Sequence, residues 1–294
     1  SGVVMAELLN SLGLLAKKQS RFGDAANAYQ QALKFLVPSD KLWTSVATNY
    51  ADTSRKLGNL DEAEKQYEAV IRALKEQFGS DNVPQCAQVY NSLGIIHKKK
   101  GNYRKALQLY QLSTKIIKQF FGSEPHELAA INQANIGDVH RKLGEYEKAE
   151  TSYYTALNSL KTLYGPNHVE VAEVMHSQGL VSKKQGRYDE AEGYYTCALS
   201  IIEKSLGVDH YKYGIYSNSL GDVERKRGNY STAMNLYVQA LKILQDTLGA
   251  SHIEVADVLF SMGLVDNQLE DYQGALKKFK TAQEIIKREF GSGH

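Results

Sequence analysis

The chain has 294 residues, with 35 Lys and Arg against 33 Asp and Glu and a formal net charge of +2. This near balance excludes a chain drawn to nucleic acid or membranes by its overall charge, so any charge that serves a partner must be local. Only four prolines occur in a chain rich in Ala, Leu, Tyr, Lys and Glu, which predicts helices rather than sheets. Length alone permits one domain or two.

The sequence also bears on the cellular compartment. No run approaches the roughly 18 apolar residues of a membrane span, and the N-terminus lacks the basic and apolar segments of a secretory signal. Cys86 and Cys197 are the only cysteines and lie far apart, which favours buried free thiols in a reducing compartment over a disulfide. We therefore expect a cytoplasmic protein without a membrane partner.

A turn motif recurs along the chain, with the pattern Gly-x-Tyr, then Ala, then a second aromatic residue, as in Gly144, Tyr146, Ala149 and Tyr153. Its seven copies, with weaker ones at each end, begin at Ser20, Gly58, Gly101, Gly144, Gly186, Gly228 and Glu270. A small residue precedes each copy by seven positions: Gly13, Ala51, Gly94, Gly137, Gly179, Gly221 and Gly263. A nearly constant period predicts identical units that bury their apolar faces by stacking.

Each unit is predicted to be two antiparallel helices joined at the Gly-x-Tyr turn, with the small residue where the helices touch. In chain order the seven pairs are expected at about 6–39, 44–80, 87–123, 130–166, 172–208, 214–250 and 256–291. Together they predict one all-α domain over 3–291, an α-solenoid that forms a right-handed superhelix. The seven small residues are separated by intervals of 38, 43, 43, 42, 42 and 42 positions, and the short first interval predicts a tighter connection near Pro38.

The junction between units carries a second motif, Gly-x-x-His followed by Val-Ala, at 165–172 and 249–256. With the turn motif, it resembles the tetratricopeptide repeat family, whose usual period is about 34 residues, and especially the 42-residue form of kinesin light chains. Light chains place Pro after that His, where this chain has Val169, Tyr211 and Ile253. The resemblance implies a protein-interaction scaffold whose first helices line a concave groove. The junction motif recurs at 290–294, which predicts further repeats beyond this chain.

Several residues could suggest a metal, a cofactor or catalysis. His168, His210 and His252 recur at the junctions, but helices pack roughly 8–10 Å apart and zinc needs ligand nitrogens within about 2 Å. We expect these histidines, and His97 and His140, to be structural. The motif tyrosines are expected in the core: Tyr103, Tyr110, Tyr146, Tyr153, Tyr188, Tyr195, Tyr230 and Tyr237. No phosphate-binding loop, nucleophile elbow or His-Glu-x-x-His is present, so we expect neither an enzyme nor a cofactor.

Basic pairs stand four and five residues after the small residue in six of the seven repeats. They are Lys17-Lys18, Arg55-Lys56, Lys98-Lys99, Arg141-Lys142, Lys183-Lys184 and Arg225-Lys226, and the seventh repeat has Asn267-Gln268. One interpretation is a cationic surface along the groove. The other is compensation of the helix macrodipole, which is worth about 0.3–1 kcal/mol per cation. The sequence leaves both open.

The position after the small residue alternates between aliphatic residues and aspartate: Leu14, Asp52, Ile95, Asp138, Leu180, Asp222 and Leu264. Each aspartate is followed three residues later by Arg, a helical pair spacing. The alternation indicates duplication of a two-repeat unit, with or without a selected ligand. If a ligand was selected, the aliphatic patches between Asp-Arg pairs would suit an extended peptide with apolar anchors and acidic residues.

We therefore predict a scaffold or adaptor that binds an acidic, partly apolar segment of a protein partner. The candidate partner-binding residues are Asn91, Ile95, Lys98, Lys99, Asp138, Arg141, Lys142, His176, Leu180, Lys183, Lys184, Asn218, Asp222, Arg225 and Lys226. The alternative is an array that self-associates through its ends or convex face, because the first helix has no polar cap and is rich in apolar residues, namely Leu8, Leu9, Leu12, Leu14 and Leu15. Nucleic-acid binding is disfavoured because Asp138 and Asp222 would repel phosphates.

Overall fold

Helices account for all the regular structure of residues 2–290, the part of the chain that the computed structural model describes. The chain divides into two units, Ser1–Glu145 and Tyr146–His294, and each is described by itself. The first contains α1 (Gly2–Lys18), α2 (Phe22–Leu33), α3 (Lys41–Lys56), α4 (Leu60–Phe78), α5 (Pro84–Lys99), α6 (Tyr103–Phe121) and α7 (Glu127–Lys142). The second contains α8 (Tyr146–Tyr164), α9 (Val169–Lys184), α10 (Tyr188–Leu206), α11 (Tyr211–Arg227), α12 (Tyr230–Leu248), α13 (Ile253–Gln268) and α14 (Tyr272–Phe290). The all-α prediction is confirmed.

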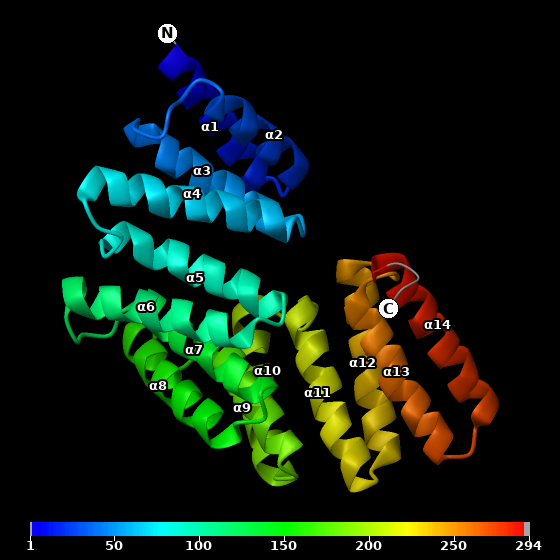
Figure 1. The fold of residues 1–294 in the computed structure, drawn as a ribbon. Helices are drawn as coiled ribbons and strands as arrows, with labels where there is room; N and C mark the ends of the chain where they lie inside the picture. Colours follow the sequence, from blue (N-terminus) through cyan, green and yellow to red (C-terminus); the bar gives the residue numbers. More distant parts are fainter. Residues whose placement is uncertain (1, 291–294) are drawn as a thin grey trace. The chain divides into compact units, whose positions relative to one another are not determined.

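Consecutive helices pack as antiparallel hairpins (Figure 1), namely α1 with α2, α3 with α4, α5 with α6, α9 with α10, α11 with α12 and α13 with α14. The fourth expected pair, α7 and α8, is divided between the two units. The predicted helix pairs are thus confirmed, whereas the repeat bounds and a single domain over 3–291 stay predictions. The junction motif expected to lead into a further repeat extends into 291–294, outside the described residues.

In each hairpin whose first helix has glycine as its small residue, an aromatic ring of the second helix lies directly against that glycine. A Cβ atom added to Gly94 would lie 2.5 Å from Cε1 of Tyr110, and one added to Gly179 would lie 2.5 Å from Cε1 of Tyr195. Real Cβ atoms do not approach that closely, so only glycine allows this spacing of the two helices. The rings themselves are fully buried: Tyr29, Tyr67, Tyr110, Tyr153, Tyr195 and Tyr237.

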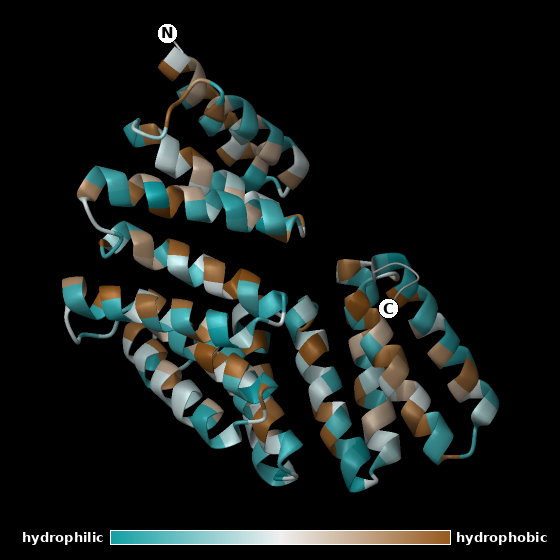
Figure 2. Cartoon of the chain, in the orientation of Figure 1, coloured by the Kyte–Doolittle hydropathy of each residue, from teal (hydrophilic) through white to brown (hydrophobic). Residues whose placement is uncertain are grey.

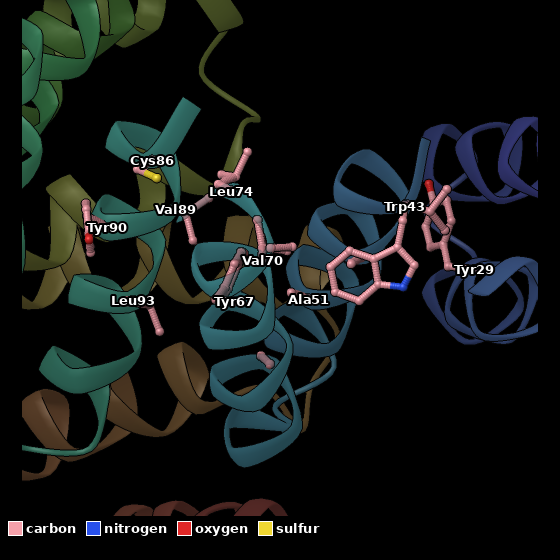
Figure 3. Packing of buried hydrophobic residues seen from close by; sticks show 14 of the residues in the cluster. Tyr29, Trp43, Ala51, Tyr67, Val70, Leu74, Cys86, Val89, Tyr90 and Leu93 are labelled. Atoms are coloured by element: carbon pink, nitrogen blue, oxygen red, sulfur yellow. The ribbon is translucent and has the colours of Figure 1, made fainter. Parts of the chain in front are cut away.

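Apolar clusters lie between successive hairpins in each unit. Figure 3 shows part of one such cluster in the first unit, where Tyr67, Val70 and Leu74 of α4 lie near Val89 and Leu93 of α5. Along the helices, hydrophobic residues alternate with hydrophilic ones (Figure 2), as expected for helices with one buried face. The stacking of one hairpin on the next is therefore an apolar contact.

The first helices of the hairpins form the inner side of each unit. In the first unit α1 contacts α3, α3 contacts α5 and α5 contacts α7; in the second, α9 contacts α11 and α11 contacts α13. Within the described part of either unit, no two second helices approach each other that closely. Because the second helices are farther apart, each unit curves with its first helices inside.

The junction histidines begin the first helices. The Nδ1 atom of His168, His210 and His252 accepts a hydrogen bond from the backbone N–H two residues later, at 3.2–3.3 Å. This contact satisfies an N–H group that the helix start leaves without a partner. The structural role predicted for these histidines is confirmed. His126 caps α7 in the same way, and sequence reasoning missed it because His126 stands four rather than three residues after Gly122.

Three expectations need correction. Cys197 is exposed, since it lies on the solvent side of α10, whereas Cys86 is buried and both thiols are free. The first tyrosines of the motif, such as Tyr103 and Tyr188, are only partly buried because they lie at the start of the second helix. The short first interval comes from α2, which has 12 residues where the other second helices have 19, and the connection that follows it is not tighter.

We expect Gly94→Val to destabilise the protein by about 1–3 kcal/mol, because the new side chain overlaps the Tyr110 ring in a packed core. Gly193→Ala is the matched control: Gly193 is also inside a helix, but nothing lies within 4 Å of its added Cβ, so that variant should be about 0.5–1 kcal/mol more stable. Thermal and urea unfolding measure both. Equal effects of the two substitutions would contradict the proposed role of the glycine.

Candidate partner-binding surface

The basic pairs of the first helices divide into two rows with different surroundings. The first cations, which are Lys17, Arg55, Lys98, Arg141, Lys183 and Arg225, are all partly buried. The second cations, which are Lys18, Lys56, Lys99, Lys142, Lys184 and Lys226, are all exposed. Both rows lie in the last turns of their helices, where either could offset the macrodipole. Only their partners distinguish them.

The first cations form ion pairs with the alternating aspartates. Asp222 lies 2.7 Å from Nζ of Lys183 in the preceding repeat and 3.4 Å from an Nη atom of Arg225 in its own helix. Its carboxylate also accepts a hydrogen bond of 2.9 Å from the Tyr237 hydroxyl. Asp222 therefore joins two first helices and one second helix.

The same arrangement recurs at the other two aspartates. Asp52 lies 3.7 Å from Lys17 and 3.9 Å from Arg55, and its carboxylate accepts a hydrogen bond of 2.5 Å from Tyr67. Asp138 lies 2.8 Å from Lys98 and 3.7 Å from Arg141. The aspartate that recurs in every second repeat is thus the acidic member of an ion-pair cluster that joins two repeats.

These clusters change the ionisation of their members. Burial is the largest influence on Asp222 and opposes its charge, but Lys183, Arg225 and the Tyr237 hydroxyl together outweigh it, so the pKa of Asp222 is below its usual value. Burial, with the nearby charge of Asp52, raises the pKa of Tyr29 to about 12. Asp222 is therefore ionised at neutral pH, and its contacts lie within the fold.

The second cations remain available. Within residues 2–290, no ion pair involves Lys18, Lys99 or Lys142 of the first unit, and Lys56 lies 4.9 Å above the Phe22 ring. In the second unit Lys184 and Lys226 are likewise exposed, and no described residue pairs with them. Lys18, Lys99, Lys142, Lys184 and Lys226 are thus exposed cations of the first helices that form no ion pair among the described residues.

The polar candidates Asn91 and His176, which precede the small residue of their helices, contact side chains of the next repeat. Asn91 is only 2% exposed, and its amide donates to Asn132 at 2.7 Å, whose own amide donates to Ser113 at 2.8 Å. The His176 ring stacks on Tyr216 with centroids 4.2 Å apart. Sequence reasoning missed Asn132, Ser113 and Tyr216. Asn132 and Tyr216 stand about one repeat from their partners Asn91 and His176, which is a usable signal, whereas Ser113 is only 19 residues from Asn132.

The remaining candidates are partly buried. Asn218 lies on α11, and its side-chain oxygen is enclosed. Ile95 packs against the cluster around Tyr110, and Leu180 packs against the cluster around Tyr195. Each aliphatic side chain still reaches the surface and offers a small apolar contact beside the lysines.

Further ion pairs, not foreseen from the sequence, link neighbouring repeats near the turns. Lys100 contacts Asp61 and Glu64 of the preceding repeat at 2.5 Å, and Arg227 contacts Asp189 at 2.5 Å. Opposite charges 36–39 residues apart were the available signal. His97 and His140 each lie against a glutamate, at 3.3 and 2.5 Å, in keeping with the structural role expected for them.

None of the helices over 2–290 combines the length and the apolarity that crossing a lipid bilayer requires. No group of three His, Cys, Asp or Glu side chains over the same residues is arranged to hold a metal ion.

The family of the chain follows from its repeats. The tetratricopeptide repeat model matches residues 43–119, 127–204 and 177–246. The chain belongs to the tetratricopeptide repeat family. No curated protein sequence gives a significant match. Tetratricopeptide repeats generally serve as protein-interaction scaffolds, and this chain is a scaffold of that kind.

Solved structures share the fold of this tetratricopeptide repeat chain. The apo quorum sensor NprR of B. thuringiensis has a TM-score of 0.76 at 15% identity, covering 97% of this chain and 77% of NprR. A Rap protein complexed with competence and sporulation factor has a TM-score of 0.69 at 17% identity, covering 98% of this chain and 76% of the Rap protein. TPR-like repeats designated a kinesin light chain from P. anserina have a TM-score of 0.55 at 15% identity, covering 71% of this chain and 99% of the repeat protein. Such low identities show a common fold.

We expect Asp222→Asn to lower the free energy of unfolding at pH 7 by about 1–3 kcal/mol, because Lys183 and Arg225 lose their partner in a partly buried site. The folded pKa of Asp222 is lowered, so its contribution is complete above the unfolded pKa of about 3.9 and is lost as the pH falls through the folded value. The difference between wild type and variant should therefore shrink below about pH 4.

Asp189→Asn is the control for this variant. It also removes a cross-repeat ion pair, with Arg227, but the Asp189 side chain is fully exposed. Urea unfolding between pH 3 and 7 should show no measurable change for this variant. A loss at Asp189 equal to that at Asp222, or a loss at Asp222 that is independent of pH, would refute the cluster's role.

Proposed function

We propose that this tetratricopeptide repeat protein binds an extended acidic segment of a protein partner along the second cations of its first helices. The aliphatic residues Ile95 and Leu180 provide apolar contacts beside the lysines of their own units. We infer a cytoplasmic adaptor without catalytic activity or cofactor, in keeping with its two free thiols. Asn91 and the aspartates are not part of the proposed contact, because the fold already uses them.

One observation carries the proposal. Lys18, Lys99 and Lys142 of the first unit occupy equivalent positions on inner helices, are exposed, and have no ion pair among the described residues. The first cations beside them are paired with aspartates at 2.8–3.7 Å. A regular row of unpaired charge on a concave side attracts a ligand of opposite charge, and nearby low-dielectric walls strengthen the field.

Helix capping explains the second cations less completely. The first cation of each pair already lies in the last turn of its helix, and so does a histidine in α5 and α7. One cation there is enough to offset the helix dipole, whose effect fades beyond the last turn. A second lysine at the same position in six helices adds little stability, which favours a role outside the fold.

The structural neighbours support a binding role of this general kind. One of them is a Rap protein complexed with competence and sporulation factor, and another is a quorum sensor. Both proteins share this fold over nearly the whole chain, and the complex of the Rap protein supports a binding role for this fold. The acidic character of the partner rests on the lysines of this chain alone.

The test is a charge reversal, Lys99→Glu with Lys142→Glu, and binding of a fluorescein-labelled peptide of alternating Glu and Leu read by polarisation. Wild type should bind, and the variant should lose at least about tenfold in affinity, since each exposed contact is worth roughly 0.2–1 kcal/mol and reversal adds repulsion. Binding should also weaken as salt rises, because charges are screened beyond about 8 Å at physiological ionic strength.

Lys75→Glu with Lys118→Glu is the matched control. Both lysines are exposed in the last turns of second helices, so this variant changes the net charge and the helix dipoles in the same way. It should bind like wild type. If both double variants lose stability equally and neither loses affinity, the lysines serve capping and the proposal is wrong.

A further inference from the structure

A cavity lies on the outer side of the second unit, between the second helices α8 and α10. Its volume is about 490 Å³, within the range of small-ligand sites, and α9, which contacts both helices (Figure 1), forms its floor. Gln178 and Ser182 of α9 are 7% and 2% exposed, whereas Tyr154 of α8 is 62% exposed. The cavity therefore has a buried polar floor and an open rim.

The floor contains a hydrogen-bond acceptor that the fold leaves unused. The side-chain oxygen of Gln178, Oε1, is buried and has no hydrogen-bond partner among residues 2–290. A buried acceptor of this kind costs free energy, because folding removes its contacts with water and supplies no other donor. A ligand that brings an N–H group into the cavity removes that cost.

Stacking of the repeats does not require a polar residue at this position. The residue just before the small residue is apolar or aromatic in the other six first helices: Leu12, Tyr50, Leu93, Ile136, Leu220 and Met262. In the corresponding groove between α4 and α6, Leu93 and Leu109 stand where this cavity has Gln178 and Tyr194. The glutamine is thus a departure from the repeat pattern that the packing alone does not explain.

The charged residues that line the cavity are two carboxylates and one cation. Glu150 and Glu190 both pair with Arg187, through Oε1 of Glu150 and Oε2 of Glu190, so the second oxygen of each carboxylate can still accept a hydrogen bond. Burial and the charges of Glu190 and Glu150 raise the pKa of the Tyr194 hydroxyl, although Arg187 acts in the opposite direction. The excess negative charge favours a cationic ligand.

The aromatic residues indicate which cation fits. Tyr154 of α8 and Tyr194 of α10 line the cavity from the two helices beside α9. A guanidinium group is flat and weakly hydrated, stacks on aromatic rings and donates several hydrogen bonds in one plane, whereas an ammonium group is compact and strongly hydrated. Rings, carboxylates and an unpaired amide oxygen together suit a guanidinium on an alkyl stem.

We propose that this cavity binds an alkylguanidinium group, carried by an arginine side chain of a protein partner or by a free small molecule. The guanidinium stacks on the tyrosines and donates hydrogen bonds to Gln178 and to the second oxygens of Glu150 and Glu190. Its charge is opposite to that of the segment proposed for the lysine row. The cavity also lies between second helices, so this proposal is independent of the proposed function.

Nuclear magnetic resonance of the ¹⁵N-labelled full chain, titrated with N-acetyl-arginine amide, tests the proposal. Backbone signals of 150–154, 178–182 and 187–194 should shift and saturate at millimolar ligand. N-acetyl-citrulline amide has the same shape without the charge. It should bind at least about tenfold more weakly, because hydrogen bonds between charged groups are stronger than neutral ones.

A peptide with one arginine flanked by glycines distinguishes the two sources of the ligand. Binding as tight as that of N-acetyl-arginine amide indicates that the cavity admits a side chain on a polypeptide. Binding of the small compound without the peptide indicates a free small molecule. Either result supports the guanidinium site.

Gln178→Leu gives this position the residue that α5 and α11 carry. The variant should bind N-acetyl-arginine amide at least about tenfold more weakly, and its thermal unfolding midpoint should rise, because the unpaired buried acceptor is gone. A glutamine that serves only the fold predicts the reverse, namely a lower midpoint and unchanged affinity.

Glu150→Gln and Glu192→Gln form a matched pair that leaves the floor intact. Each removes an ion pair with an arginine of the next repeat, Arg187 or Arg227, but Glu192 belongs to the next groove, where Leu220 stands in place of Gln178. Affinity should fall about tenfold in the first variant and stay at the wild-type value in the second. Circular dichroism verifies that all variants keep their helical content.

Several results would overturn the guanidinium site. They are the absence of saturable shifts in wild type, equal binding of the citrulline compound, and preferential binding of N-acetyl-glutamate amide. Unchanged affinity in both Gln178→Leu and Glu150→Gln would do the same, because the ligand would then bind elsewhere on the chain. None of these results bears on binding of the acidic peptide to the lysine row.

Discussion

The contact between a tyrosine ring and a glycine backbone sets the geometry on which the other features depend. In α5 and α6 the Tyr110 ring occupies the space that a Cβ of Gly94 would need, so the two helices approach more closely than ordinary side chains allow. The same contact in other hairpins gives units of nearly equal shape. Equal units stack in a constant register, and that register places equivalent residues of successive first helices beside one another.

Because the repeats stack, each basic pair of the sequence contains one cation that is paired within the fold and one that is exposed. Lys98 and Lys99 are neighbours in sequence, yet Lys98 reaches Asp138 of the next repeat while Lys99 is exposed. Removing either partner of a partly buried pair leaves a charge without compensation, so the paired cations belong to the stability of the array. The exposed ones cost the fold little and are free to contact another molecule. Structure and interaction thus use adjacent residues on the same turn of a helix.

The ends of the array follow from the same stacking rule. An internal hairpin has an apolar face toward each neighbour, and α1 and α14 keep such faces where no described neighbour covers them. Leu8 and Leu276 are 56% and 52% exposed and retain the apolar character of internal positions.

The local structure could be predicted from the sequence, because the Gly-x-Tyr turn, the helical spacing of apolar residues and the 42-residue period are visible in the order of residues alone. The sequence therefore predicted the helix pairs, the capping histidines at 168, 210 and 252, and the set of basic residues on the first helices. It did not separate Lys98 from Lys99, or show that Asn91 is buried against Asn132, since those partners lie about 40 residues away. Only the tertiary structure decided these, because burial and ion pairing depend on which repeat stacks against which.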